Sequence, residues 1–167
     1  MVIIIMGISG SGKTTVGQQL ADDLGWKYFD GDDFHSVKNI AKMSVGIPLN
    51  DDDRSVWLSQ ISQHIKELIK KHDNAVVSCS ALKQEYRRQL QNDSEAVKFV
   101  YLKGPKALIK KRLESRSGHF MSVDLINSQF ETLEEPEQVL VVDIKQSPKI
   151  ISNAIQQHFD IINNNQR

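Results

Sequence analysis

Residues 7–14 read G-I-S-G-S-G-K-T, which matches the pattern G-x-x-x-x-G-K-[ST] and directly follows an apolar run at residues 2–6. A glycine-rich loop between a buried strand and a helix turns its backbone N–H groups inward around an anion, and the positive end of the helix dipole adds to the attraction. In such a loop Lys13 can reach the β- and γ-phosphates of a nucleotide, and the hydroxyl of Thr14 can hold Mg²⁺. The pattern and its position therefore predict a nucleotide-binding loop, which we call the phosphate loop.

A second group of candidate residues is the acidic run Asp30-Gly31-Asp32-Asp33, which follows a strand-like segment at residues 26–30. Transfer of a phosphoryl group to an alcohol needs a carboxylate that orients the hydroxyl and accepts its proton. Closely spaced carboxylates repel one another unless a metal ion or basic groups neutralise them. A solvated acidic turn has the same composition, but behind a strand and in a chain with a phosphate loop we favour a kinase site.

Other classes of nucleotide-binding protein fit less well. The chain has no N-K-x-D after an apolar run, which argues against a guanine-specific GTPase, and 167 residues are too few for the additions of most oligomeric ATPases. The apolar run at residues 75–79 ends without an aspartate. Asp143 follows another apolar run, but we interpret it as the ordinary end of a strand at the sheet edge. Asp30 or Asp32 must then serve both the metal and the acceptor, as in small-metabolite kinases.

Basic residues recur near the same strand ends. The aspartates at positions 51–53 fit the N-terminus of a helix, where carboxylates accept from free N–H groups, and Arg54 could point at an anionic substrate. Residues 118–121 read G-H-F-M and lie between two helical patterns, where a lid could close on bound nucleotide. Two basic pairs have helical spacing, Lys83 with Arg87 and Arg112 with Arg116. The sequence does not decide whether each pair lies on a solvent-exposed helix face or on a wall of the site.

The elements that must position these residues follow from periodicity. Five apolar runs have strand length, at residues 2–6, 26–30, 75–79, 97–102 and 139–143. Segments with helical period lie at residues 12–24, 52–71, 82–90, 105–116, 123–133 and 148–159. Strands that alternate with helices predict an α/β fold, with a parallel sheet covered on both faces. Ligands of such a sheet bind at the carboxyl ends of the strands, where the polar residues described above are expected to meet.

The composition is that of an ordinary globular protein, with 40% hydrophobic residues, 25% charged residues and a formal net charge of zero. Nothing in it indicates a nucleic-acid or membrane partner. The longest apolar run is far too short to span a bilayer, and a single cysteine, Cys79, excludes an internal disulfide. We expect one kinase domain over residues 1–167, a cytosolic protein and a frayed tail at residues 163–167.

Taken together, these residues resemble the gluconate kinase (gluconokinase) family, small P-loop kinases that phosphorylate D-gluconate at its 6-hydroxyl with ATP. The resemblance runs from residue 1 to about residue 143, and its most specific parts are G-I-P-L-N-D-D-D-R at residues 46–54 and S-C-S-A-L-K at residues 78–83. Shorter matches lie at residues 6–14, 30–35, 39–43, 57–58, 86–87, 99–104, 112–113, 116, 118–121 and 128–136. One departure is Ser36, where the family usually has proline, and we expect it to loosen this turn without removing a functional group.

The resemblance implies a three-layer α/β/α P-loop kinase fold of the nucleoside-monophosphate-kinase type, with a five-stranded parallel sheet and a helical lid at about residues 112–132. It implies ATP and Mg²⁺ as cofactors and D-gluconate as a small-molecule substrate. It implies no nucleic-acid and no membrane partner, and it allows a homodimer.

The resemblance also implies roles for individual residues. Lys13, Asp32 and Arg116 are the expected catalytic residues, with Asp32 orienting the 6-hydroxyl and accepting its proton. Thr14 and Asp30 are expected at the Mg²⁺ ion. The expected ATP contacts are Gly7, Ile8, Ser9, Gly10, Ser11, Gly12, Lys13, Thr14, Thr15, Arg112 and Arg116. The expected gluconate contacts are Asp32, His35, Arg54, Lys83, Arg87, His119 and Gln129.

Competing hypotheses remain at this point. Another metabolite kinase, for shikimate or a nucleoside, would use similar positions, so a panel of substrates must decide. A nucleotide-binding regulator without turnover would keep the phosphate loop, but Asp32, Arg54 and Arg87 together argue against it, because a sensor need not assemble an acceptor site. A nucleic-acid-dependent ATPase is disfavoured by the net charge of zero.

Overall fold

The computed structural model describes residues 1–115 and 123–161. Its centre is a sheet of five parallel strands in the order β2-β3-β1-β4-β5. The strands are β1 (Val2–Met6), β2 (Lys27–Asp30), β3 (Ala75–Ser78), β4 (Val97–Lys103) and β5 (Leu140–Asp143). The five predicted strands and the edge position of the last one are therefore confirmed.

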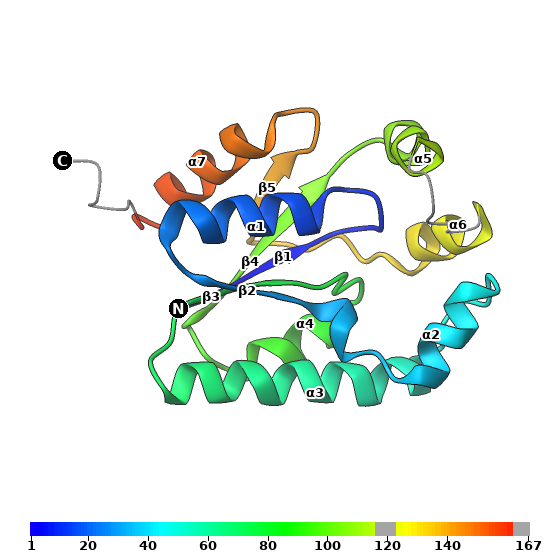
Figure 1. Ribbon diagram of the computed structural model, residues 1–167, viewed down its shortest axis with the longest axis horizontal. Helices are drawn as coiled ribbons and strands as arrows, with labels where there is room; N and C mark the ends of the chain where they lie inside the picture. Colours follow the sequence, from blue (N-terminus) through cyan, green and yellow to red (C-terminus); the bar gives the residue numbers. More distant parts are fainter. Residues whose placement is uncertain (116–122, 162–167) are drawn as a thin grey trace.

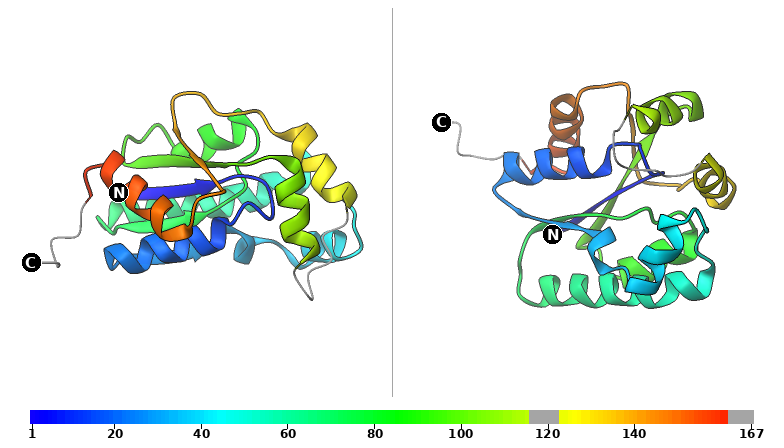
Figure 2. Two further views of the ribbon diagram at one scale, coloured as in Figure 1. Left: turned by 90° about the horizontal axis from the view of Figure 1, so that it is seen from above. Right: turned by 45° about the vertical axis from the view of Figure 1, so that its right-hand side comes forward.

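Helices cover both faces of the sheet (Figure 1). They are α1 (Lys13–Leu24), α2 (Val37–Ser44), α3 (Asp51–Lys70), α4 (Gln84–Gln91), α5 (Lys106–Glu114), α6 (Val123–Thr132) and α7 (Pro148–His158), with a short 3₁₀-helix η1 (Gly31–Phe34). Figures 1 and 2 show α1 and α7 on one face, α3 and α4 on the other, and α2, α5 and α6 gathered at the end of the sheet where β1 runs into the phosphate loop. The predicted three-layer α/β/α fold is confirmed.

The core is divided in two by the sheet, because successive side chains of a strand point to opposite faces. From β1, Ile3 and Ile5 pack with the apolar sides of α1, α5 and α7. Val2, Ile4 and Met6 pack with those of α3 and α4. All five residues of β1 are buried, which fits its central position in a parallel sheet. The strand end that carries the phosphate loop is thus fixed from both sides.

Two elements were not predicted, the 3₁₀-helix η1 and the helix α2. The side chain of Ser36 accepts a hydrogen bond from the backbone N–H of Asn39 and caps the N-terminus of α2. The expectation that Ser36 loosens this turn was therefore wrong, since the serine begins a helix here. Further along, Asn39 Nδ2 donates to the carbonyl of Asp53 at 2.8 Å and Lys42 pairs with the Asp53 carboxylate at 2.6 Å, so α2 is anchored to the start of α3.

The predicted helix start at residues 51–53 is confirmed. Asn50 caps α3 and forms a reciprocal capping box with Asp53. The helix after β3 begins at Gln84, two residues later than expected, because Ala81 has a left-handed backbone (φ 44°) and Lys83 is still extended. Of the predicted lid at residues 112–132, the end of α5 and the helix α6 are described, and residues 116–122 lie outside the described part, as does the tail at residues 163–167.

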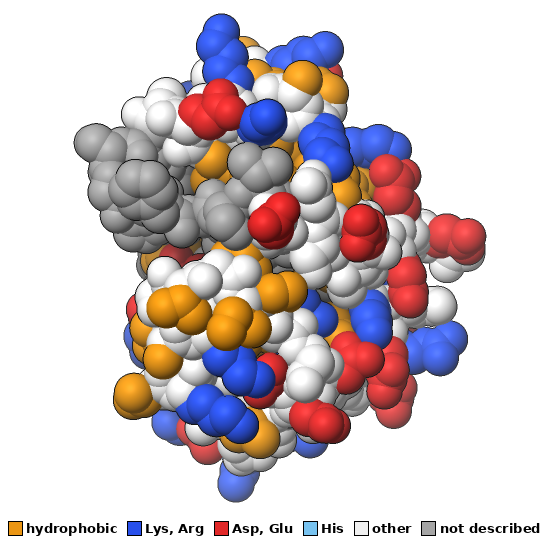
Figure 3. All heavy atoms as spheres, turned by 90° about the vertical axis from the view of Figure 1, so that its right-hand side faces the viewer, with side chains coloured by type: hydrophobic (Ala, Val, Ile, Leu, Met, Phe, Trp, Pro, Cys, Tyr) orange, Lys and Arg blue, Asp and Glu red, His pale blue; other side chains and the backbone are white. Residues whose placement is uncertain are grey.

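Large apolar side chains are exposed around α2 and the segment that follows it. Figure 3 looks onto this end of the molecule and shows hydrophobic side chains gathered on one part of the face. The exposed residues of this region are Val37, Ile40, Val45, Ile47 and Val56. None of the described helices combines the length and apolar character that a bilayer-crossing helix needs.

Candidate active site

The phosphate loop joins β1 to α1 in the conformation that an anion cradle needs. Gly12 precedes α1 with a left-handed backbone (φ 99°) and has no side chain that could cap the helix, so the first N–H groups of α1 stay available to a ligand. Gly10 also has a positive φ of 84°, and a Cβ atom there would lie 2.7 Å from Leu113 Cγ. Within the loop Ser11 Oγ is buried and has no hydrogen-bond partner among the described residues. These features fit a bound nucleotide phosphate.

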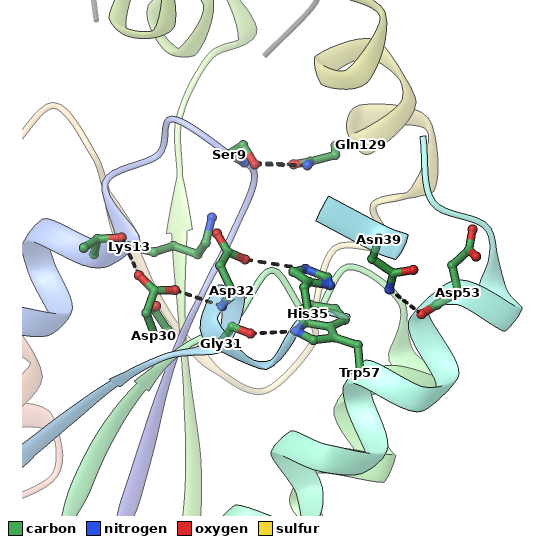
Figure 4. A network of polar contacts seen from close by, with 12 residues as sticks. Ser9, Lys13, Asp30, Gly31, Asp32, His35, Asn39, Asp53, Trp57 and Gln129 are labelled. Atoms are coloured by element: carbon green, nitrogen blue, oxygen red, sulfur yellow. Dashed lines mark hydrogen bonds and ion pairs between the residues drawn. The ribbon is translucent and has the colours of Figure 1, made fainter. Parts of the chain in front are cut away.

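Asp30 connects the phosphate loop to the acidic run (Figure 4). Its Oδ2 accepts hydrogen bonds from Thr14 Oγ1 and from the Tyr28 hydroxyl, both at 3.1 Å. Its Oδ1 accepts from the backbone N–H of Asp32 at 3.0 Å and so caps η1. The Thr14 hydroxyl donates its proton to Asp30 and keeps its lone pairs for a cation.

This pair fits the way Mg²⁺ is bound in phosphoryl-transfer sites, through one or two carboxylates or hydroxyls together with the nucleotide phosphates. In the part of the chain that the structure describes, no cluster of three or more His, Cys, Asp or Glu side chains could hold a metal ion without a nucleotide.

Asp32 and His35 are placed by the buried ring of Trp57. Trp57 Nε1 donates to the carbonyl of Gly31 at 2.6 Å, and the His35 ring stacks on the indole with centroids 4.2 Å apart. His35 Nε2 lies 3.7 Å from Asp32 Oδ1; the His35 side chain is only 5% exposed, whereas that of Asp32 is 79% exposed. Burial lowers the pKa of His35 more than the Asp32 carboxylate raises it, so the imidazole stays neutral at pH 7. Sequence reasoning missed Trp57, although W-L at residues 57–58 was part of the family match.

One pocket collects most of the predicted catalytic and substrate residues. It is lined by Ser9, Lys13, Asp32, His35, Met43, Pro48, Leu49, Arg54, Trp57, Ser80, Leu82, Leu125, Ser128 and Gln129. Lys13 Nζ donates to the carbonyl of Ile8 at 3.2 Å within the phosphate loop. The structure therefore brings the phosphate loop, the acidic run and the basic Arg54 to one cavity at the carboxyl ends of the strands.

Gln129 fastens α6 to the phosphate loop. Its Oε1 accepts from the backbone N–H of Ser9 at 2.8 Å, and its Nε2 donates to Ser9 Oγ at 3.0 Å (Figure 4). Gln129 and Ser9 are 120 residues apart in the sequence. Their contact places α6 along one side of the pocket, next to the phosphate loop.

Lys83 and Arg87 lie differently from the expectation. Lys83 Nζ contacts both carboxylate oxygens of Asp51, at 2.9 and 2.8 Å. The guanidinium of Arg87 is buried, and its Nη1 donates to the carbonyls of Ala81 and Leu82 at 2.9 and 3.1 Å. Neither residue lines the pocket, and Arg87 instead stabilises the segment after β3 that does.

Comparison with known proteins decides the family. The family model described as Shikimate kinase matches residues 9–158. The thermosensitive gluconokinase of Escherichia coli (strain K12) is 48% identical over 134 residues, which cover 80% of this chain and 72% of the relative. The chain belongs to the gluconokinase family. Two crystal structures agree: an unliganded sugar kinase from Janibacter sp. HTCC2649 (39% identity, TM-score 0.90, 96% and 94% of the two chains) and a gluconokinase from Sinorhizobium meliloti 1021 (38%, 0.85, 98% and 94%).

A second depression lies beside the phosphate loop, next to Arg112. Arg112 Nη2 donates to the carbonyl of Ile144 at 2.6 Å and its Nη1 to that of Ser11 at 3.3 Å. The depression has a volume of about 270 Å³ and is lined by Gly10, Ser11, Gly12, Thr15, Val16, Arg112, Ser115, Ile144, Gln146 and Pro148. The segment 144–148 was not predicted as part of the site. Arg116 and His119, two further predicted site residues of this gluconokinase-family chain, lie outside the described residues.

Proposed function

We infer that this protein is a gluconokinase, which transfers the γ-phosphoryl group of ATP to the 6-hydroxyl of D-gluconate and forms 6-phospho-D-gluconate and ADP. One observation carries the proposal: a single pocket holds a phosphate loop, an exposed carboxylate on a fixed backbone and an arginine from a third element. Curated gluconokinases that are 37–48% identical to this chain support the choice of acceptor.

Asp32 would orient the 6-hydroxyl and accept its proton. Its side chain reaches into the pocket while its backbone N–H is bound by Asp30 and the preceding carbonyl by Trp57. A carboxylate with a free side chain and a fixed backbone suits a base that must meet a mobile hydroxyl, and such bases typically contribute about 10²–10⁴ in rate.

Lys13 and the N–H groups at the start of α1 would bind the phosphates and stabilise the charge that spreads over the transferred group. Thr14 and Asp30 would hold Mg²⁺, which when bound neutralises charge on the β- and γ-phosphates. Arg112 would contact the nucleotide, and Arg116 would close on the phosphates as a further cation. The remaining loop residues, from Gly7 to Thr15, would supply backbone contacts to ATP.

Arg54 would pair with the carboxylate of gluconate, because its planar fork suits bidentate recognition of a carboxylate. Neutral His35 and the amide of Gln129 would bind sugar hydroxyls, together with His119. The single acid group of gluconate and its row of hydroxyls match a pocket that combines one arginine with several neutral polar groups.

A coupled ADP-release assay tests this function, with MgATP and D-gluconate beside shikimate, a nucleoside, gluconate epimers and a blank without acceptor. We expect turnover with D-gluconate at about 1–100 s⁻¹. Turnover with shikimate instead would keep the kinase mechanism and replace the substrate. ATP binding without turnover on any acceptor would favour a nucleotide-dependent regulator.

Two further expectations belong to this proposal, namely one kinase domain over residues 1–167 and a cytosolic location, and the family resemblance also allows a homodimer. A single cooperative transition in urea unfolding would support the single domain. Sedimentation velocity at several protein concentrations tests the dimer, since a monomer at all concentrations would exclude it. Cell fractionation tests the cytosolic location.

A further inference from the structure

Four polar side chains join the N-termini of α3 and α4 beside the pocket. Asp51 and Arg54 come from the first turn of α3, and Lys83 and Tyr86 from the start of α4. The Tyr86 hydroxyl donates to Asp51 Oδ1, and Arg54 Nη1 donates to the Tyr86 oxygen at 3.5 Å. The guanidinium carbon of Arg54 also lies 5.9 Å from the centroid of the Tyr86 ring. Only Arg54 of these four lines the pocket.

The direction of these hydrogen bonds follows from the protonation of Tyr86. Burial raises the pKa of Tyr86, and its bond to Asp51 raises it further, so the phenol keeps its proton at pH 7. A phenol has one proton, and Tyr86 gives it to Asp51. Its oxygen is therefore left as an acceptor, which faces the guanidinium of Arg54. The chain runs in one direction, from Arg54 to Tyr86 to Asp51.

Lys83 is the main charge partner of Asp51. Its ammonium lies 2.8 Å from Asp51 Oδ2, whereas Arg54 Nη1 lies 3.9 Å from Asp51 Oδ1. The bond from Lys83, followed by that from Tyr86, lowers the pKa of Asp51, and the same contact raises the pKa of Lys83. Asp51 is therefore mainly the counterion of Lys83. The positive charge of Arg54 is only weakly compensated and stays available to an anion in the pocket.

The Arg54 side chain is also largely buried and in contact with Tyr86. It is 12% exposed and lies against the Tyr86 ring and hydroxyl. A free arginine side chain populates many rotamers, and a ligand would otherwise have to remove much of this freedom on binding. A guanidinium that is oriented before the substrate arrives gains affinity by avoiding that cost.

We propose that Tyr86 and Asp51 are positioning residues that hold the Arg54 guanidinium at the pocket wall for the carboxylate of the acceptor, and that Lys83 acts on Asp51 and not on the substrate. This inference rests on the proposed role of Arg54 in binding that carboxylate. Recognition of the substrate carboxylate would then depend on how α3 and α4 pack against each other.

The test is a double-mutant cycle of Tyr86→Phe and Arg54→Ala, read as the KM and the calorimetric Kd for D-gluconate. Tyr86→Phe keeps the ring and removes the hydroxyl. It should raise the KM and Kd for D-gluconate roughly threefold to tenfold and leave kcat and the KM for ATP within about twofold. In the Arg54→Ala background the same change should alter the Kd by less than about twofold, because its partner is gone. Asp51→Asn should behave like Tyr86→Phe.

Tyr101→Phe is the matched control, since Tyr101 is another buried tyrosine of the same core but lies outside the pocket. It should leave the Kd for D-gluconate unchanged, and thermal unfolding should show that every variant is folded. If Tyr86→Phe has no effect, or if its effect multiplies fully with that of Arg54→Ala, the positioning role is excluded while the role of Arg54 stands. An unchanged Kd for D-gluconate in Arg54→Ala alone would instead refute the role of Arg54.

Discussion

Replacing Trp57 with phenylalanine should damage both the stability and the catalytic rate of this protein. Trp57 is 3% exposed, and its indole N–H donates at 2.6 Å to the carbonyl of Gly31, the residue directly before Asp32. Phenylalanine leaves that carbonyl without its partner, which costs about 1–3 kcal/mol. The smaller ring also leaves a cavity, and since whole removal of a buried tryptophan side chain costs about 3–5 kcal/mol, we assign about 1–2 kcal/mol to this part.

The sum is a loss of about 2–5 kcal/mol in the free energy of unfolding, which for a chain of this size lowers Tm by roughly 4–20 °C. The carbonyl of Gly31 would move toward another donor and take Asp32 with it. Because a misplacement of about 1 Å can cost 10²-fold in rate, we expect kcat to fall roughly tenfold to a hundredfold. ATP affinity should change little, since the hydrogen bond of Trp57 is to Gly31 and not to the phosphate loop.

The assay is urea unfolding followed by circular dichroism, with kcat from ADP release. Trp26→Phe is the matched control, because Trp26 is the other tryptophan and precedes β2 at the end of the sheet far from the site. The control should keep its kcat. A Trp57→Phe protein that loses less than about 1 kcal/mol and keeps its kcat would refute the role given to this hydrogen bond.

Three other predictions follow from the same contacts. Asp32→Asn should lower kcat by about 10²–10⁴ with unchanged ATP affinity in calorimetry, and a variant with most of its activity would contradict the assignment of Asp32 as the base. Gly10→Ala should weaken ATP binding at least about tenfold, because its Cβ meets Leu113 and its φ is positive, whereas Gly25→Ala shares the positive φ, has open space around its Cβ and should leave ATP affinity unchanged. Burial lowers the pKa of His35 from 6.5, so the unfolded chain binds more protons below that pH and stability is lost as the pH falls through about 6.5. In His35→Gln the free energy of unfolding, measured with urea, should depend less on pH between about pH 7.5 and 5.5. An unchanged pH dependence would contradict this prediction.

The sequence was most informative where local chemistry determines the structure. The phosphate loop needs glycines at fixed spacing behind a strand, so it could be predicted. The aspartates at positions 51–53 indicated where α3 begins, but the residue that caps it, Asn50, was not singled out. The central strands β1 and β3 are buried along their whole length because helices cover both faces of the sheet, and their apolar runs show this in the sequence. Helix α2 was missed because it is short and because Ser36 was compared with the usual proline and not considered as a helix cap.

Contacts between elements that are distant in the chain could not be predicted from the sequence. Lys83 and Arg87 share a spacing that indicates one helix face, yet Lys83 precedes α4 and Arg87 is buried against the carbonyls of Ala81 and Leu82. The partner of Lys83 is Asp51, which lies 32 residues away and was interpreted from its local position as a helix-capping residue. The spacing of residues along one helix does not predict such a pairing, because the pairing depends on how α3 and α4 pack.

The two carboxylate oxygens of Asp30 accept hydrogen bonds from two different parts of the proposed active site. Oδ2 holds Thr14 of the loop that would carry the phosphoryl donor, and Oδ1 holds the backbone of Asp32, which would receive the acceptor. Together with the hydrogen bond from Trp57 to Gly31, which also fixes Asp32, the separation of the two reactants would therefore depend on the length of the Asp30 side chain. Lengthening it by a methylene group would shift both reactants relative to each other, so no change at Asp30 can be assigned to one substrate by kinetics alone.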